Sequence, residues 1–132
     1  MKLTDLAIGD LILINNTPHK IQAIDSIDAE ILADDELYYV GEDRCHSEDK
    51  IEGIPITPEI LENNGFIKVN SQRYDYGYPD TDCYVKVNPK KNMIHVNGRN
   101  ANSNLYSHSF VHELQRALRL CGLNELADNF KI

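Results

Sequence analysis

Short apolar runs, separated by residues that favour turns, recur along most of the chain and restrict it to antiparallel sheet structure. In the first part of the chain these runs lie at residues 11–14, 19–24, 29–33 and 36–40. Asn15 and Asn16 follow the first run, and asparagine tolerates the backbone angles that tight turns need. Strands of this length and spacing are typical of a strongly bent antiparallel sheet. We therefore expect a small SH3-like barrel at about residues 1–53.

The segment IPITPEILENNGF, at residues 54–66, carries the signals of a short helix. Thr57 is a suitable N-cap, Pro58 fits the first helical position, and Glu59 complements the partial positive charge of a helix N-terminus. Gly65 can adopt the left-handed conformation that ends a helix. A helix of about two turns is predicted here.

The chain between this helix and residue 108 carries a second series of short runs, which predicts an antiparallel meander. The runs lie at residues 66–70, 72–78, 83–87, 93–97 and 104–108. Turn residues separate them, and the last turn is expected to span residues 98–102. In the third run Tyr84 and Lys86 share one face of the strand, while Val85 and Val87 share the other.

The stretch VHELQRALRLCG, at residues 111–122, predicts an amphipathic helix that ends at Gly122. Its apolar residues fall on one stripe at helical spacing. They are Phe110, Val111, Leu114, Ala117, Leu118 and Cys121. If this helix packs on one face of the meander, the fold class is α+β, with one part at residues 1–53 and a second at residues 54–132.

Composition favours a folded protein of the cytoplasm. The chain has 132 residues, of which 42% are hydrophobic, and this is enough to bury an interior. No apolar run approaches the roughly 18 residues of a membrane span, so no membrane partner is expected. The three cysteines are odd in number and far apart. This spacing matches neither a disulfide framework nor a zinc ribbon, and it fits a reducing compartment.

Charge is divided unequally along the chain, whose net charge is -8. Residues 1–66 hold 4 Lys/Arg against 15 Asp/Glu, and residues 67–132 hold 9 against 6. An acidic first half repels nucleic acid and anionic membranes, because both bind through cationic side chains. Asp34, Asp35 and Glu36 are therefore candidate binding residues for a basic protein partner.

Three tyrosines recur at period two and predict an aromatic stripe on one strand face. They are Tyr74, Tyr76 and Tyr78. Such a stripe can stack on bases or bind a protein, and it can equally cover the core of a thin sheet. Together with Lys90, Lys91 and Arg99 it forms the candidate surface for nucleic acid, which is the alternative binding hypothesis.

Catalytic and metal-binding signatures are incomplete. His112-Glu113 begins like the zinc-protease motif His-Glu-x-x-His, but Arg116 occupies the place of the second histidine. A third hypothesis is a small hydrolase or metalloprotein centred on Cys83 and His95, with Cys45 and His46 as further possible ligands. These four residues lack the local spacing of known catalytic or metal sites. We predict no catalytic residue, no metal ligand and no cofactor.

Three segments, at residues 1–12, 54–66 and 111–122, resemble a family of small proteins carried by Bacteroides-type gut bacteria, their phages and mobile elements. The similarity lies in the opening "IGD" segment and in the IPxTxEILxxNGF and VHELQxALRLCG motifs. The resemblance implies an accessory protein of mobile DNA and brings no established activity or functional residue. The function expected from the whole sequence is a non-enzymatic binding module with a protein partner, rather than an enzyme.

Overall fold

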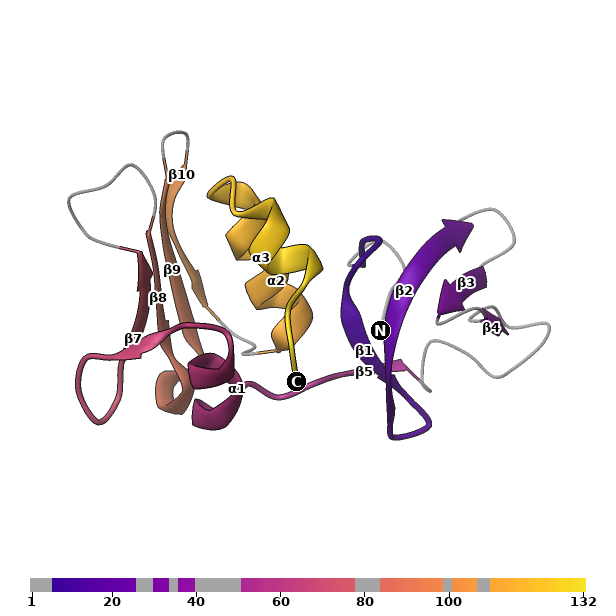
Figure 1. Ribbon diagram of the computed structural model, residues 1–132, viewed down its shortest axis with the longest axis horizontal. Coiled ribbons are helices and arrows are strands. Elements are labelled where there is room, and N and C mark those ends of the chain that lie inside the picture. The colour runs from indigo at the N-terminus through magenta and orange to yellow at the C-terminus, as the bar shows by residue number, and fades with distance from the viewer. Residues whose placement is uncertain are drawn as a thin grey trace. The chain divides into compact units, whose positions relative to one another are not determined.

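A computed structural model of the protein describes residues 6–25, 30–33, 36–39, 51–77, 84–98, 101–106 and 110–132. Over these residues the fold is α+β, as predicted, with antiparallel sheets and short helices (Figure 1). The chain divides into two compact units, Met1–Ile54 (unit 1) and Pro55–Ile132 (unit 2). In the described ranges, no helix has the length and apolar character needed to cross a membrane.

Unit 1 contains a five-stranded antiparallel sheet in the order β4-β3-β2-β1-β5. The strands are β1 (Leu11–Ile14), β2 (Thr17–Asp25), β3 (Glu30–Ala33), β4 (Glu36–Tyr39) and β5 (Ile51–Gly53). The four runs predicted as strands in this region all contain one. Among the described strand pairings, none joins β4 to β5. The predicted closed barrel is therefore not confirmed.

A two-residue turn joins β1 to β2. Ile14 pairs with Thr17, and both residues between them have positive φ angles, 51° at Asn15 and 64° at Asn16. This is the pattern of a type I′ hairpin, which asparagine favours. The hairpin brings Pro18 into β2, opposite Leu13. That pair is a non-hydrogen-bonded one, so the N–H that proline lacks is not needed to hold β1.

Strand β2 pairs with different neighbours along its two halves. Residues Thr17 to Lys20 face β1, whereas β3 pairs with the stretch from Ile21 onward, and the register shifts between Ile21 and Ala23. A bulge at this place increases twist and bends the strand. A bend of this kind is a feature of strongly curved sheets.

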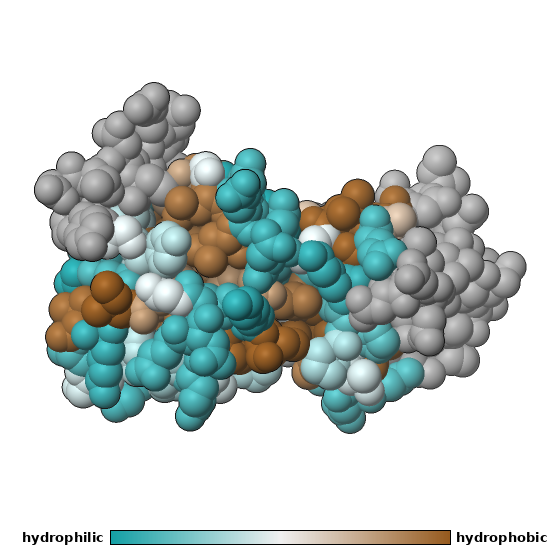
Figure 2. Space-filling model, in the orientation of Figure 1, coloured by the Kyte–Doolittle hydropathy of each residue, from teal (hydrophilic) through white to brown (hydrophobic). Residues whose placement is uncertain are grey.

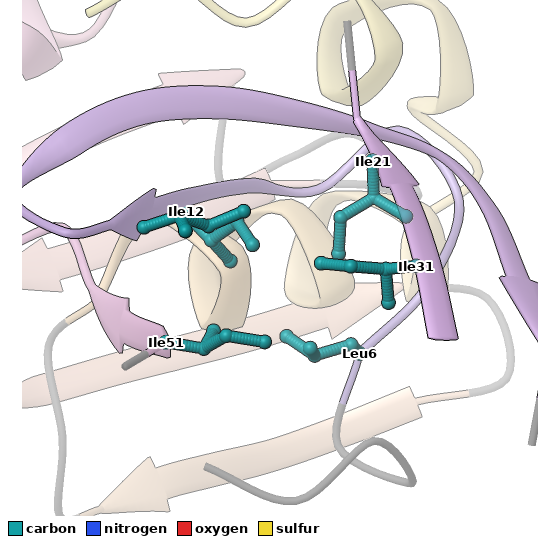
Figure 3. Packing of buried hydrophobic residues seen from close by; sticks show 6 residues of the cluster. Leu6, Ile12, Ile21, Ile31 and Ile51 are labelled. Atoms are coloured by element: carbon teal, nitrogen blue, oxygen red, sulfur yellow. The ribbon is translucent and has the colours of Figure 1, made fainter. Parts of the chain in front are cut away.

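The core of unit 1 is aliphatic (Figure 3). Leu6, Ile12, Ile21, Ile31 and Ile51 point toward one another from different segments, together with the buried Ile14. Each is 8% exposed or less. Burial of one such side chain contributes about 1.5–3 kcal/mol, so this cluster stabilises the sheet of unit 1.

Unit 2 contains a second five-stranded antiparallel sheet, a meander in the order β10-β9-β8-β7-β6. Its strands are β6 (Ile67–Lys68), β7 (Tyr74–Gly77), β8 (Tyr84–Asn88), β9 (Met93–Gly98) and β10 (Ala101–Tyr106), with the short helix η3 (Pro89–Lys91) between β8 and β9. The predicted turn at residues 98–102 is wrong. Gly98 pairs directly with Ala101, so the strands continue closer to the turn than the polar residues suggested.

Helix α1 (Pro58–Asn63) forms for the reasons its sequence gives. The Oγ1 atom of Thr57 accepts a hydrogen bond from the N–H of Ile60 (3.2 Å), and Pro58 occupies the first turn. Gly65 has a φ angle of 85° and ends the helical segment. The predicted cap, first residue and terminator are confirmed.

A side-chain clamp joins the end of α1 to the end of the chain. The Nδ2 atom of Asn64 donates to the carbonyl oxygens of Ile60 (2.8 Å) and Lys131 (2.7 Å). Its Oδ1 atom accepts from the N–H of Lys131 (2.8 Å). Asn64 is buried, and so is Phe130, the residue before Lys131. One amide group therefore holds both backbone polar groups of a residue 67 positions away.

Helix α2 (Val111–Leu120) lies against one face of the second sheet, and α3 (Asn124–Asp128) packs against α2 (Figure 1). The predicted stripe of α2 is largely buried, with Val111, Leu114, Ala117 and Leu118 fully enclosed. Gln115 is also fully buried, and its Nε2 atom donates to the carbonyl of Ala127 in α3 (2.9 Å). The apolar stripe thus anchors α2, and the Gln115 hydrogen bond joins α2 to α3.

Candidate functional site

The second sheet has two chemically different faces, because residues directly opposite one another on neighbouring antiparallel strands point to the same side. Its register assigns every described position to one of them. The inner face carries Tyr74, Tyr76, Val85, Val87, Ile94 and Val96. The outer face carries Ile67, Asp75, Tyr84, Lys86 and His95.

The tyrosine stripe belongs to the inner face. Tyr74 is only 4% exposed. The ring of Tyr76 lies 5.4 Å from that of Phe66, centroid to centroid, and a methyl group placed on Gly65 would lie 3.3 Å from its Cε2 atom. Both tyrosines therefore pack into unit 2, which favours the core role over base stacking. Tyr78 lies outside the described residues.

An ion pair lies at the β7 edge of the outer face. The Nε atom of Arg73 donates to Asp75 Oδ1 (2.8 Å), and its Nη2 atom donates to Oδ2 (2.6 Å). This bidentate geometry fixes the plane of the guanidinium group. The pKa of Arg73 is raised, first by its hydrogen bond to Asp75, then by the charges of Asp75 and Tyr84, while burial opposes the shift. The group therefore remains charged at neutral pH.

A second cluster lies on β8 and β9 of the same face. The Nζ atom of Lys86 lies 5.2 Å from the centre of the Tyr84 ring, within the range of a cation–π contact. The ring of His95 lies 6.4 Å from that of Tyr84. Tyr84 is buried, whereas Lys86 and His95 are half-buried. A lysine and a histidine thus flank a buried aromatic ring.

Exposed aliphatic residues border these polar groups. Ile67, opposite Asp75 on β6, is 64% exposed, and Val69 is 51% exposed. The N–H of Val69 donates to the carbonyl of Arg73 (2.9 Å), which holds this segment beside the ion pair. Hydrophobic surface is visible on the part of unit 2 where β7 is drawn (Figure 2). We call Ile67, Val69, Arg73, Lys86 and His95 the outer-face patch.

Of the three basic residues proposed from the sequence, the structure describes Lys90 and Lys91. Lys90 and Lys91 are exposed in η3, directly before β9. Arg99 follows the last residue of β9 and lies outside the described residues, as do Asp34 and Asp35. Glu36 is the first residue of β4, and its side chain is outside the described set. The acidic candidates therefore remain a prediction.

The histidine, glutamate and cysteine of α2 take part in packing. The His112 ring stacks on Phe110 with centroids 5.8 Å apart and planes 13° from parallel. The Oε1 atom of Glu113 accepts from the N–H of Phe110 (3.4 Å), and the Sγ atom of Cys121 donates weakly to the carbonyl of Tyr84 (3.9 Å). These contacts agree with the interpretation of the VHELQRALRLCG segment as a scaffold helix.

Across the part of the chain that the structure describes, no three histidine, cysteine, aspartate or glutamate side chains come together in a group that could hold a metal ion. His95 lies on the outer face, whereas Cys45, His46 and Cys83 are outside the described residues. The third hypothesis therefore gains no geometric support from the described residues.

Comparisons with protein-family models, with curated proteins and with solved structures returned no match to this chain.

The sequence contained part of the signal for the outer-face patch. Alternation in the strand of Tyr84 and Lys86 already placed these two residues on one face. The pairing of Arg73 with Asp75 gave no comparable signal, because it depends on the conformation of the chain entering β7. Exposure of Ile67 was equally hidden, since an apolar residue in a short run suggests burial.

Proposed function

We propose that this protein is a non-enzymatic accessory module that binds a protein partner through the outer-face patch of unit 2. The observation that carries the proposal is the exposure of Ile67 and Val69 directly beside the bidentate Arg73–Asp75 pair. Apolar side chains next to ordered arginine are typical of protein interfaces, in which an apolar centre is surrounded by polar groups.

The composition of the patch supports protein binding over catalysis. Two of its titratable groups are engaged in pairs, Arg73 with Asp75 and Lys86 with the Tyr84 ring, and the ring of the third, His95, lies 6.4 Å from that of Tyr84. Catalysis needs a nucleophile or base within reach of an open reacting position. The described residues supply fixed charge and apolar surface instead, and these are the properties used in recognition.

Affinity capture from the native host tests this function. Tagged wild-type protein is expected to retain a defined partner that the Ile67→Ser/Val69→Ser variant loses. Leu120→Ser is the matched control, because Leu120 is 52% exposed on α2, away from the patch. Loss of the partner in the control alone, or equal retention by all three proteins, refutes the proposed surface.

For unit 1 we propose an SH3-like arrangement, supported by its strand order and by the bulge that lets β2 serve two neighbours. Residues Met1–Ile54 hold four Lys/Arg against thirteen Asp/Glu, which favours a basic protein segment as a second partner. Neutralising Asp34, Asp35 and Glu36 should weaken binding of a basic peptide. Unchanged binding would remove the acidic-surface version of the proposal.

A cytoplasmic role in a phage or mobile element belongs to the same proposal. The three motif segments support it, together with cysteines that match no disulfide framework. The scaffold roles of Thr57, Asn64 and Gly65 explain why such a motif can persist without a catalytic residue. The co-purification experiment identifies the partner and thereby tests this context.

A further inference from the structure

We infer that the partner surface that binds the outer-face patch is an acidic protein segment; this rests on the proposed function and specifies its chemistry. The inference starts from an uneven distribution of charge inside unit 2, between its sheet and its helices. The charges compared are those of the described segments 67–77 and 84–98, which contain β6 to β9; residues 78–83, between β7 and β8, lie outside the described residues.

These sheet segments are strongly cationic. Their five basic residues are Lys68, Arg73, Lys86, Lys90 and Lys91, and their one carboxylate is Asp75. Every other described carboxylate of unit 2 lies on a helix. These helical carboxylates are Glu59, Glu62, Glu113, Glu125 and Asp128. Because Asp75 is already neutralised by Arg73, the sheet segments keep four lysines without a carboxylate among them.

Lys86, Lys90 and Lys91 are close enough for their fields to add. Lys68 lies opposite Tyr74 and so points to the inner face, whereas Lys86 lies on the outer face. Lys90 follows Lys86 by four residues, so their Cα atoms are at most about 14 Å apart. Lys90 and Lys91 follow directly after β8. The Debye length is about 8 Å at physiological ionic strength, so the potentials of these lysines overlap near the surface. An acidic segment is the complementary partner.

The exposed groups favour protein over nucleic acid as the source of that negative charge. Of the tyrosines on β7 and β8, Tyr74 and Tyr84 are buried, and Tyr76 packs on Phe66. Open aromatic rings are what single-stranded nucleic acid uses for stacking. The exposed Ile67 instead offers an anchor for an aliphatic side chain, which nucleic acid lacks.

Fluorescence anisotropy with three labelled probes tests the inference on the full chain. The probes are a peptide carrying leucines among glutamates, the same peptide with lysine for glutamate, and single-stranded oligothymidylate. We expect the acidic peptide to bind, with an affinity loss of about tenfold or more between about 20 mM and 150 mM salt. Lys86→Gln/Lys90→Gln/Lys91→Gln should weaken it by about tenfold, and Lys131→Gln by less than about twofold.

The other outcomes overturn the inference in distinguishable ways. Preferential binding of the lysine peptide, lost in Ile67→Ser/Val69→Ser, refutes the acidic partner and keeps the protein-binding patch. Binding of oligothymidylate alone, lost in the triple lysine variant, replaces the protein partner by nucleic acid. If no probe binds, the acidic partner is rejected, while the proposed function is still decided separately by the capture experiment. Circular dichroism of each variant establishes that lost binding does not reflect unfolding.

Discussion

The two faces of the second sheet are built from the same strands and carry opposite chemistry. On β9, Ile94 and Val96 point to the buried inner face, whereas His95 between them lies on the outer face. Side chains alternate across a strand, so a single segment can hold the fold on one side and present charge on the other. Because the two faces carry different residues, side chains of one face can be replaced while those of the other stay unchanged.

Replacing neighbours on β9 should give the largest contrast. Ile94 is 2% exposed, so Ile94→Ala is expected to lower the free energy of unfolding by about 2–5 kcal/mol. His95→Ala should cost less than about 1 kcal/mol, because its side chain is half-buried on the polar face. Native-state hydrogen exchange of the β8 and β9 amides measures both. Equal losses of unfolding free energy in the two variants would contradict the difference in burial between the two faces.

The Asn64 clamp tests whether the C-terminal residues belong to the folded side of unit 2. Asn64→Ala removes two donated hydrogen bonds and one accepted hydrogen bond, and it should cost about 1–3 kcal/mol. The amide of Lys131 should then exchange faster. Asn63→Ala, at the exposed neighbouring position, is the control and should change stability by less than about 0.5 kcal/mol. Unchanged exchange at Lys131 would contradict the clamp.

Two glycines form a matched pair that isolates the packing of Tyr76. Gly65 and Gly122 have φ angles of 85° and 80°, so alanine is strained at either position by about 1–2 kcal/mol. Only at Gly65 does the added methyl group meet a neighbour, at 3.3 Å from the Tyr76 ring, whereas nothing lies within 4 Å at Gly122. Gly65→Ala should therefore be the more destabilising change in urea unfolding. If Gly122→Ala were the more destabilising change, the Tyr76 ring would not lie against Gly65.

The Arg73–Asp75 pair should contribute least to stability, although it belongs to the proposed binding surface. The Arg73 side chain is 36% exposed, and solvent screening limits such pairs to below about 1 kcal/mol. Asp75→Asn should therefore leave urea unfolding almost unchanged and still alter partner binding. A large loss of stability with unchanged binding would assign the pair to the scaffold instead.

Most of the fold could be predicted from local sequence. Thr57, Gly65 and the Asn15-Asn16 pair act through short-range geometry, so their roles were visible without any knowledge of the tertiary structure. The apolar stripe of α2 was equally visible, because its buried residues recur at helical spacing. The predicted turn at residues 98–102 was wrong, because Gly98 and Ala101 pair as strand residues. Polar residues can continue a strand when a neighbouring strand forms hydrogen bonds with their backbone.

The proposed binding face could not be predicted from local sequence alone. Period-two spacing showed that Tyr74 and Tyr76 share a face, but only their pairing with Val87 and Val85 shows that this face is the inner one. The side-chain clamp of Asn64 on Lys131 links distant parts of the chain, which no local pattern encodes. Long-range register, rather than residue type, decides which side of a strand is available to a partner.

Site-specific photo-crosslinking in the native host tests the central claim, that the outer face of the second sheet is the binding surface, most directly. A photoreactive amino acid replaces Ile67 in one protein and Leu120 in another, both exposed positions in unit 2. We expect a discrete crosslinked partner from position 67 and none from position 120. A partner captured from position 120 alone, or from neither position while co-purification persists, would contradict this claim.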